Sequence, residues 1–434
     1  MLYDIAFFIF SIFYLPALIF KGKLHRDFCE RFGLYDKSKR ESLATGQGTI
    51  WIQAVSVGEV ALCKSLIPAL KEKFPGLQIV FSTITKTGNA LAKKLFSKDA
   101  VIIYFPLDFS FVVNRCVNLL NPRIYVMIET EIWPNLLNAL SGKGARSILI
   151  NGRISDRSFG KYKLVRRFLR PTLEKINSFC MQSELDAERI KFLGAPAQKV
   201  NVTGNMKFDS VVAADTEITQ SLRSLLGLES CEELLVAGST HRGEEELMIS
   251  VFKELAGSNP KLNLLIAPRH IERSGEVEAL ARSKGFVAVR VSTLSLSPPS
   301  DPGPRIFILD TIGQLKDVYL IGTLVFVGGS LVKHGGQNPI EPAVLGRPVI
   351  FGPHMFNFRD IARILLDNAA AIQVFDNEEL LDRVRFLLSD KEKAAALGRN
   401  AKRAVLNNRG ATARNLEAIG QSIAFYSSKL KAES

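Results

Sequence analysis

Short apolar runs alternate with longer amphipathic stretches along the chain from about residue 49 onward. The apolar runs are continuous, which is typical of strands that are buried on both faces of a parallel sheet. Stretches between them, such as 59–74 and 87–96, have the spacing of helices, and Pro75-Gly76 ends the first of these. The predicted strands are 50–55, 78–82, 101–104, 123–128, 146–150, 178–181 and 200–202, followed by 234–237, 262–267, 286–291, 305–309, 323–327, 348–351 and 371–374.

The alternation loosens across residues 211–232 and then resumes, which predicts two domains joined by a linker. A chain of 434 residues is also longer than one hydrophobic core usually supports. Each half is expected to be a doubly wound α/β domain, with ligands bound in a cleft beyond the carboxyl ends of the strands. The expected boundaries are 49–210 for the first domain, 233–400 for the second and 401–434 for a helical tail.

The amino terminus has a different pattern. Residues 5–20 are apolar apart from Ser11 and rich in aromatic side chains. Basic residues follow directly, at Lys21, Lys23, His25, Arg26 and Arg31. A secretory signal carries its charge before the apolar run, so this order favours a membrane anchor over 1–22 and a basic membrane-proximal segment over 23–48. The run is shorter than the roughly 20 residues of a perpendicular span, so a spanning helix and an interfacial helix both remain open. A buried helix is the alternative, although the run has hardly any polar face.

Composition narrows the class of protein further. Hydrophobic residues make up 47% and charged residues 23% of the chain, as in folded globular proteins. The five cysteines have neither metal-site nor disulfide spacing, which indicates a reducing, cytosolic compartment. A net charge of +13 calls for a polyanionic partner, and the aromatic amino terminus favours anionic lipid and a phosphorylated substrate over nucleic acid.

The segment 323–354 contains the strongest candidate for a nucleotide site. An apolar strand breaks into Gly328-Gly329-Ser330, and a second glycine turn, Gly335-Gly336, leads into Asn338, Pro339, Ile340 and Glu341. Glycine turns at the end of a strand let backbone N–H groups approach a phosphate, and a helix N-terminus adds positive potential. Glu341 is then placed to hold two ribose hydroxyls. The alternative is that Asn338 and Glu341 form a helix capping box.

Charged side chains follow three strands of the first half. Glu59 begins the helix after the first strand, either as a general base with a raised pKa or as a residue favoured by the helix dipole. Glu129 and Glu131 follow the fourth strand, beside one of only two tryptophans. Glu129 is favoured as the functional carboxylate, since Glu131 can simply open the next helix. Lys207, after the seventh strand, either binds a phosphate or carboxylate or pairs with Asp209.

Polar turns also end the strands of the second half. Pro268 and Arg269 follow one strand, and Ile312, Gly313 and Gln314 follow another. Four of the five histidines lie in such turns, but no pair of them has metal-ligand spacing. No Asp-x-Asp pair, which many nucleotide-sugar enzymes use to hold a divalent ion, is present. No metal site is therefore predicted, and Arg269 is expected to supply the positive charge instead.

Together and in this order, the motifs resemble those of the bacterial 3-deoxy-D-manno-octulosonic acid (Kdo) transferases of lipopolysaccharide biosynthesis. The resemblance covers nearly the whole chain, and so many motifs in the correct order are highly specific. Besides the aromatic anchor it rests on SVGE, ETEIWPN, NGRIS, TGNMKFD, GSTHRGEEE, APRH, DTIGQL, GGSLVKHGGQNPIEP and FGPHMFNFRDI.

The resemblance implies both a fold and an activity. Members of this family have the GT-B arrangement, in which two Rossmann-like domains face a cleft, here with an N-terminal membrane-anchor helix. They transfer Kdo from CMP-Kdo to a lipid A precursor, lipid IVA, without a metal or other cofactor. The acceptor lies at the cytoplasmic face of the inner membrane. A single N-terminal anchor in that membrane, contacts with its anionic lipid and cytoplasmic catalytic domains are therefore expected.

Residue by residue, the resemblance implies that Glu59 is the base that deprotonates the acceptor hydroxyl in an inverting displacement. It implies that Glu129 and Lys207 stabilise the transition state. The implied CMP site consists of Pro268, Arg269, Ile312, Gly313, Gln314, Asn338, Pro339, Ile340 and Glu341. Two alternatives remain: another GT-B enzyme that uses a UDP-sugar, which would lack SVGE and ETEIWPN, and a non-catalytic membrane-bound protein that binds a nucleotide or lipid, which would not need Glu59.

Overall fold

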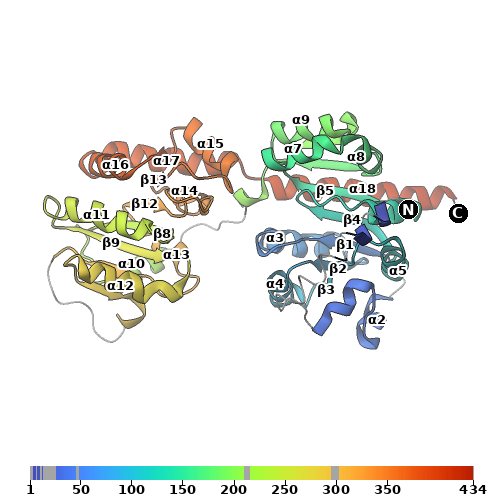
Figure 1. Ribbon diagram of the computed structural model, residues 1–434, viewed down its shortest axis with the longest axis horizontal. Coiled ribbons are helices and arrows are strands. Elements are labelled where there is room, and N and C mark those ends of the chain that lie inside the picture. Colours follow the sequence, from blue (N-terminus) through green and yellow to red (C-terminus); the bar gives the residue numbers. More distant parts are fainter. Residues whose placement is uncertain are drawn as a thin grey trace. The chain divides into compact units, whose positions relative to one another are not determined.

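The chain folds into two compact units, which comprise residues 1–210 with 409–434 (unit 1) and residues 211–408 (unit 2). A computed structural model describes residues 3–5, 7–9, 12, 26–44, 48–209, 216–294 and 303–433. Each unit contains a seven-stranded parallel sheet with helices on both faces (Figure 1). The predicted class, two doubly wound α/β domains, is confirmed.

The sheet of unit 1 has the strand order β3-β2-β1-β4-β5-β6-β7. Its strands are β1 (Thr49–Gln53), β2 (Gln78–Thr83), β3 (Val101–Tyr104), β4 (Pro122–Ile128), β5 (Arg146–Gly152), β6 (Ser178–Met181) and β7 (Val200–Val202). Its helices are η1 (Arg26–Phe32), α2 (Lys37–Leu43), α3 (Val57–Lys73), α4 (Lys86–Phe96), α5 (Ser110–Leu120), α6 (Pro134–Gly142), α7 (Asp156–Leu164), α8 (Arg166–Leu173), α9 (Glu184–Leu193), η2 (Ala197–Lys199), η3 (Met206–Asp209) and α18 (Ala411–Glu433).

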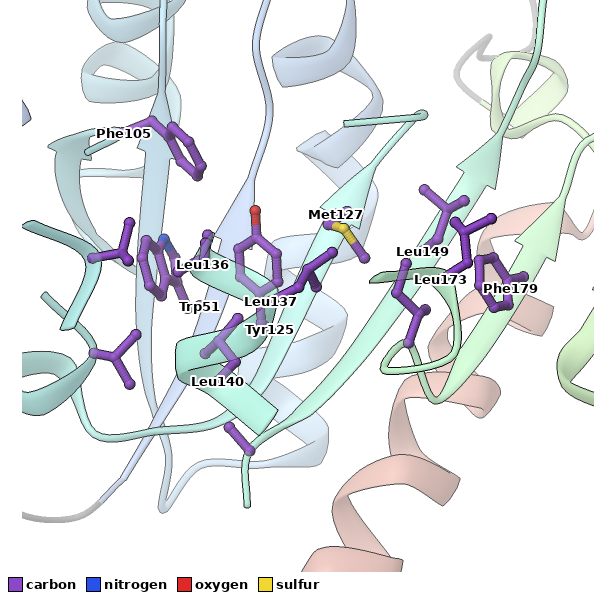
Figure 2. Close-up of a cluster of buried hydrophobic side chains, with 14 of the residues drawn as sticks. Trp51, Phe105, Tyr125, Met127, Leu136, Leu137, Leu140, Leu149, Leu173 and Phe179 are labelled. Atoms are coloured by element: carbon purple, nitrogen blue, oxygen red, sulfur yellow. The ribbon is translucent and has the colours of Figure 1, made fainter. Parts of the chain in front are cut away.

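The core of unit 1 consists of two apolar layers, one on each face of this sheet. Successive side chains of a strand point to opposite faces, so Ile50 and Ile52 of β1 pack towards α3, α4 and α18. Trp51, between them, packs on the other face with Tyr125 and with residues of α5 and α6 (Figure 2). Because helices cover both faces of the sheet, its strands are largely apolar along their length, which is the pattern seen in the sequence.

The last helix, α18, belongs to unit 1 although it follows unit 2 in the sequence. Its residues Ile419 and Ile423 are buried in the core that includes α3 and α4. The Asp209 carboxylate accepts hydrogen bonds from the N–H groups of Gly410 (2.7 Å) and Thr412 (2.6 Å), at the start of α18. Nothing in the periodicity of the tail indicated which unit this helix would join.

The sheet of unit 2 has the strand order β10-β11-β9-β8-β12-β13-β14. Its strands are β8 (Glu233–Thr240), β9 (Leu262–Pro268), β10 (Ala288–Arg290), β11 (Ile306–Ile308), β12 (Leu324–Val327), β13 (Val349–Phe351) and β14 (Ile372–Gln373). Its helices are α10 (Thr216–Leu225), which lies within the predicted linker, α11 (Glu244–Ala256), η4 (Ile271–Arg273), α12 (Ser274–Ser283), η5 (Val291–Thr293), α13 (Leu315–Val318), α14 (Ile340–Val344), α15 (Arg359–Asp367), α16 (Asn377–Ser389) and α17 (Lys391–Asn407).

Most of the predicted membrane anchor lies outside the described residues. Those that the structure describes are Tyr3, Asp4, Ile5, Phe7, Phe8, Ile9 and Ile12. Within the described part of the chain, no helix combines the length and the apolar character that crossing a bilayer requires. The anchor over residues 1–22 stays a prediction.

Candidate active site

In each sheet, two central strands mark the point where the order of the strands reverses. These neighbours are β1 and β4 in unit 1, and β8 and β12 in unit 2. Loops that leave the carboxyl ends of two such strands diverge to opposite faces, which leaves a crevice for a ligand. Glu59 and Glu129 follow β1 and β4, so the fold places the two predicted carboxylates at the crevice of unit 1.

Glu59 lies in the first turn of α3 and is only 9% exposed. Its Oε2 accepts a hydrogen bond from the N–H of Val55 (2.6 Å), and its Oε1 accepts one from the hydroxyl of Ser56 (2.9 Å). Burial, and to a smaller extent the charge of Glu129, raise its pKa to about 7 even though these hydrogen bonds oppose the rise. A carboxylate held rigidly with a pKa near neutrality suits a general base. Its place in the first turn also fits the helix-dipole interpretation, and the two roles are compatible.

Glu131, for which the sequence also allowed a role in opening the next helix, is a second candidate. The helix α6 begins only at Pro134, so Glu131 lies in the turn before it and does not open the helix. The indole N–H of Trp133 donates to Glu131 at 3.1 Å. Burial, followed by the negative charge of Glu59, raises the pKa of Glu131 to about 7. The tryptophan two residues further along was the signal in the sequence that could have identified this carboxylate.

Glu129 itself has a left-handed backbone, with a φ of 60°. This conformation is uncommon for a residue other than glycine and points to a local constraint. Its N–H donates to the carbonyl of Ile150 on the neighbouring strand β5 (3.0 Å). The charge of Glu129 acts on both Glu59 and Glu131, so the three carboxylates form one cluster.

Lys207 is placed by a chain of buried amide side chains. The Asn151 side chain, at the end of β5, accepts a hydrogen bond from the N–H of Met206 (2.9 Å), which brings this segment back across β6. The Gln182 amide donates to the carbonyl of Asn151 and accepts from the Asn205 amide, both at 2.9 Å. The Asn205 side chain in turn accepts from the N–H of Lys207 (3.0 Å). Lys207 is thus fixed near the end of β5, which is the neighbour of β4.

In unit 2, a buried carboxylate already occupies the first glycine turn. Glu244, fully buried at the start of α11, accepts hydrogen bonds through Oε2 from the N–H groups of His241 (2.9 Å) and Gly329 (2.6 Å). Its Oε1 accepts from the N–H groups of Ser330 (2.9 Å) and Leu331 (3.0 Å). The prediction that this turn offers its N–H groups to a phosphate is therefore wrong for these residues.

The glycines of both turns serve close packing instead. A Cβ on Gly328 would lie 2.5 Å from the carbonyl oxygen of Ser239, and one on Gly336 would lie 2.2 Å from the sulfur of Met355. Gly336 N donates to the carbonyl of Gly329 (2.8 Å), which folds the second turn onto the first. Side chains at these positions would force the loops apart.

Three histidines gather beside this turn. The ring of His241 stacks on that of His334, with 4.1 Å between centroids, and the ring of His270 meets it edge-on at 6.0 Å. Burial, followed by the positive charges of His334, His270 and Arg269, lowers the pKa of His241 to about 4. In the described part of the chain, no group of three or more His, Cys, Asp or Glu side chains has the arrangement of a metal site.

The predicted nucleotide-binding residues lie at the carboxyl ends of β9, β11 and β12. Pro268 ends β9, and the N–H of Arg269 donates to the carbonyl of Thr240 (2.9 Å), while the Arg269 side chain is exposed. Ile312 follows β11 and is 83% exposed. Gly313, with a φ of 91°, and Gln314 are exposed beside it.

Asn338 and Glu341 interact directly. The Asn338 amide donates to the Glu341 carboxylate (3.1 Å), and its oxygen accepts from the N–H of Ile340 (3.2 Å), the first residue of α14. The two side chains thus meet, although not with the bonds of a capping box. Burial raises the pKa of Glu341, and the charge of Lys316 opposes this rise.

Comparison with known proteins gives a consistent picture. Residues 26–210 match the family model described as 3-deoxy-D-manno-octulosonic-acid transferase (kdotransferase). The 3-deoxy-D-manno-octulosonic acid transferase of Haemophilus influenzae is 36% identical over 90% of this chain and 90% of its own length, and that of Bordetella pertussis is 32% identical over 85% and 86%. A glycosyltransferase from Rickettsia africae, 13% identical, aligns over 87% of this chain and 99% of its own with a TM-score of 0.58, which shows a shared fold.

Proposed function

Because the chain belongs to the 3-deoxy-D-manno-octulosonic acid (Kdo) transferase family, we propose that it transfers Kdo from CMP-Kdo to a lipid A precursor such as lipid IVA, in lipopolysaccharide biosynthesis. The observation that carries this proposal is Glu59, a carboxylate with a pKa of about 7 at the strand reversal of unit 1. A base with this pKa is partly ionised at neutral pH and still strong enough to accept a proton.

In this proposal the two units contribute different parts of the chemistry. Glu59 of unit 1 takes the proton of the acceptor hydroxyl, whose oxygen attacks the anomeric carbon of Kdo as the bond to CMP breaks. Direct displacement inverts the anomeric centre. Glu129 and Lys207 stabilise the charges that develop during this step. The buried amides that hold Lys207 fix its backbone before the substrate reacts. A charge that is already in place stabilises the transition state without a cost for reorganisation.

Unit 2 is proposed to bind the nucleotide. Arg269 neutralises the CMP phosphate, and Glu341 holds the ribose hydroxyls. Because Glu244 accepts the N–H groups of the first glycine turn, those groups do not neutralise the phosphate, and more of this task falls to Arg269. The exposed Ile312 offers an apolar surface for the cytosine ring. Neutralisation by an arginine is the reason to propose that transfer needs no divalent metal.

A location at the inner membrane, with the catalytic units on the cytoplasmic side, is part of the proposal. Besides the apolar residues 5–20, the helix α8 supports it, because Leu164 just before it and Phe168 within it are 86% and 77% exposed. Five basic residues are neighbours of these two residues in the sequence, namely Lys161, Lys163, Arg166, Arg167 and Arg170. Exposed apolar side chains among basic ones suit an interface with anionic lipid.

One assay tests the proposed reaction. The purified protein is incubated with CMP-Kdo and lipid IVA, and the lipid product is analysed by mass spectrometry. A mass increase by one or more Kdo residues, unchanged in excess EDTA, is expected. A product formed only from a UDP-sugar would replace the proposed donor, and transfer that is lost in EDTA and restored by Mg²⁺ would contradict metal independence.

A further inference from the structure

The start of the chain makes specific contacts with unit 1. Oδ1 of Asp4 accepts hydrogen bonds from the N–H of Ser110 (2.9 Å), the first residue of α5, and from the side-chain amide of Asn135 (2.8 Å), in the first turn of α6. The ring of Phe7 meets that of Phe109 edge-on at 4.9 Å. A carboxylate at the N-termini of two helices is favourable, because both helices present unpaired N–H groups and positive potential there.

A second carboxylate holds Asn135 from the other side. Asp108 is fully buried, and its two oxygens accept from the N–H groups of Asn135 (3.1 Å) and Leu136 (2.8 Å). The Asn135 amide also donates to the carbonyl of Asp108 (2.6 Å), and the side chain of Tyr3 hydrogen-bonds to Asp108. Asn135 is therefore fixed jointly by the interior of unit 1 and by the amino-terminal residues.

This junction adjoins, along the chain, the turn that carries Glu129 and Glu131. The turn from Glu129 to Trp133 connects β4 to α6, and the N–H of Glu129 fixes its first end to β5. Asn135 fixes the other end, two residues after Trp133, whose indole donates to Glu131. A turn fixed at both ends holds its side chains in one place, and a shift of Asn135 would be passed to Trp133 and Glu131.

We propose that Asp4 is a positioning residue for transfer: docking of the amino-terminal segment on Ser110 and Asn135 sets the turn that carries Glu129 and Glu131. The inference rests on the proposed function of this carboxylate cluster. It gives the amino terminus a role beyond holding the protein at a membrane, since Asp4, which lies within the predicted anchor over residues 1–22, also fixes the active-site turn. The position of the amino-terminal segment and the position of the turn that carries Glu129 and Glu131 are then linked through the Asp4 carboxylate.

Tryptophan fluorescence tests the position of the turn without any substrate. The chain has two tryptophans, and Trp51 is fully buried in the core, so quenching by acrylamide reports mainly on Trp133. In the full-length protein, Asp4→Ala is expected to increase quenching, because Asn135, which fixes one end of the turn, loses its hydrogen bond to Asp4 and is then held by Asp108 alone. Asp4→Asn is expected to show quenching close to that of the wild type. The hydrogen bonds from Ser110 and Asn135 go to a single oxygen, which the amide retains. Asp382→Ala, which removes an exposed carboxylate in unit 2, is the control.

Kinetics in detergent, where the membrane no longer limits access to the acceptor, test the consequence. Asp4→Ala is expected to lower kcat by about tenfold, the scale of a small misplacement of catalytic groups, with the KM for CMP-Kdo unchanged. Asp4→Asn should recover most of that loss, and Asp382→Ala should match the wild type. Asn135→Ala combined with Asp4→Ala should cost less than the two single effects multiplied, because both act through one contact.

The outcomes separate this inference from the proposed function. If the wild type forms no Kdo product, the proposed function fails, and the quenching experiment alone then decides whether Asp4 sets the turn. If the wild type is active and Asp4→Ala keeps its kcat, Asp4 is not a positioning residue. A lower kcat with unchanged quenching of Trp133 would also overturn the inference, because the effect would not pass through the turn.

Discussion

Burial gives three carboxylic acids of unit 1 a pKa of about 7, well above that of an exposed acid. They are Glu59, Glu131 and Asp108, and desolvation is the largest cause for each of them. The charge of Glu59 also raises the pKa of Glu131, and that of Glu129 raises the pKa of both. At the scale of single residues, the chemistry of the site therefore depends on how far each carboxylate is withdrawn from water.

Replacing Glu59 by Gln should abolish transfer while sparing the binding of CMP. The amide has nearly the same shape but cannot accept the proton, and loss of a general base typically costs about 10²–10⁴-fold in rate. Steady-state kinetics and calorimetric titration with CMP measure the two effects. Glu72→Gln, an exposed change on the same helix, is the control. Transfer within a few-fold of the wild type would remove Glu59 from this role.

The rate of transfer should rise with pH up to about 7 and then level off, with about a tenfold loss per pH unit on the acid side. Stability should change in the opposite direction. A carboxyl whose pKa is raised in the folded state favours folding while it is protonated, and this contribution is lost as pH rises from about 4.5 through about 7. Melting curves and rates between pH 5 and 8 measure both trends. Glu59→Gln should show a smaller fall in melting temperature over this range.

Arg269 and Glu341 should contribute to different parts of nucleotide binding. Arg269→Ala removes the positive charge proposed to face the phosphate, so it should weaken binding of CMP far more than binding of cytidine. Glu341→Ala removes the ribose contact and should weaken both ligands alike. Calorimetry with CMP and cytidine separates the two effects. Equal losses of cytidine and CMP affinity in Arg269→Ala would show that the assignment to the phosphate is wrong.

At the scale of elements, the first turn of α11 organises the loops of unit 2. Glu244 joins the loop after β8 to the glycine turn after β12, because its carboxylate accepts hydrogen bonds from four backbone N–H groups in these two loops. The adjacent Glu245, 1% exposed, accepts from the hydroxyl of Thr240 (3.0 Å) and pairs with Arg273 (2.7 Å), which follows β9. Two buried acids of one helix therefore hold loops from three strands, including those that carry His241, Arg269 and the glycine turns.

Glu244→Gln should destabilise unit 2 and disorder its nucleotide site. The amide retains one acceptor oxygen for two of the four N–H groups and presents an NH₂ group to the others, and each buried unsatisfied donor costs about 1–3 kcal/mol. Thermal unfolding and the affinity for CMP measure the two consequences. Glu246→Gln, an exposed change in the same turn, should leave both unchanged. A Glu244→Gln protein with normal stability and normal CMP affinity would contradict this role.

At the scale of the whole molecule, the net charge of +13 and the apolar amino terminus act differently on a membrane. Attraction between basic residues and anionic lipid is screened over a Debye length of about 10 Å at 0.1 M salt, whereas burial of apolar side chains is insensitive to salt. The apolar segment is therefore proposed to retain the protein, and the basic residues to orient it.

High salt should leave the full-length protein in the membrane fraction. A protein lacking residues 1–20 should instead bind vesicles of anionic lipid only at low salt, and vesicles of neutral lipid weakly at any salt. Sedimentation with vesicles at increasing salt measures both. Release of the full-length protein by salt alone would show that residues 5–20 are not buried in lipid.

Local pattern was enough to predict the strands of both sheets and their division into two units. The apolar runs at 101–104 and 178–181 coincide with β3 and β6, because a strand covered on both faces is largely apolar. The run at 200–202 coincides with β7, although this edge strand exposes Asn201 and Val202. Because both residues follow the carboxyl ends of predicted parallel strands, Glu59 and Glu129 were also expected at one edge of the sheet, and the strand order places them there. Helix boundaries were less accessible, and so Glu131 was assigned to a helix that begins three residues later.

By itself, then, the sequence determined the class of fold, the family motifs and the edge of each sheet where chemistry is proposed, since these follow from neighbours in the chain. Only the tertiary structure decided that Glu244 accepts the N–H groups of the glycine turn, that α18 returns to unit 1 and that Asp4 binds Asn135. It also decided which carboxylates are desolvated. The burial of a side chain and its hydrogen-bond partners depend on residues that are far apart in the chain, so no local sequence pattern specifies them.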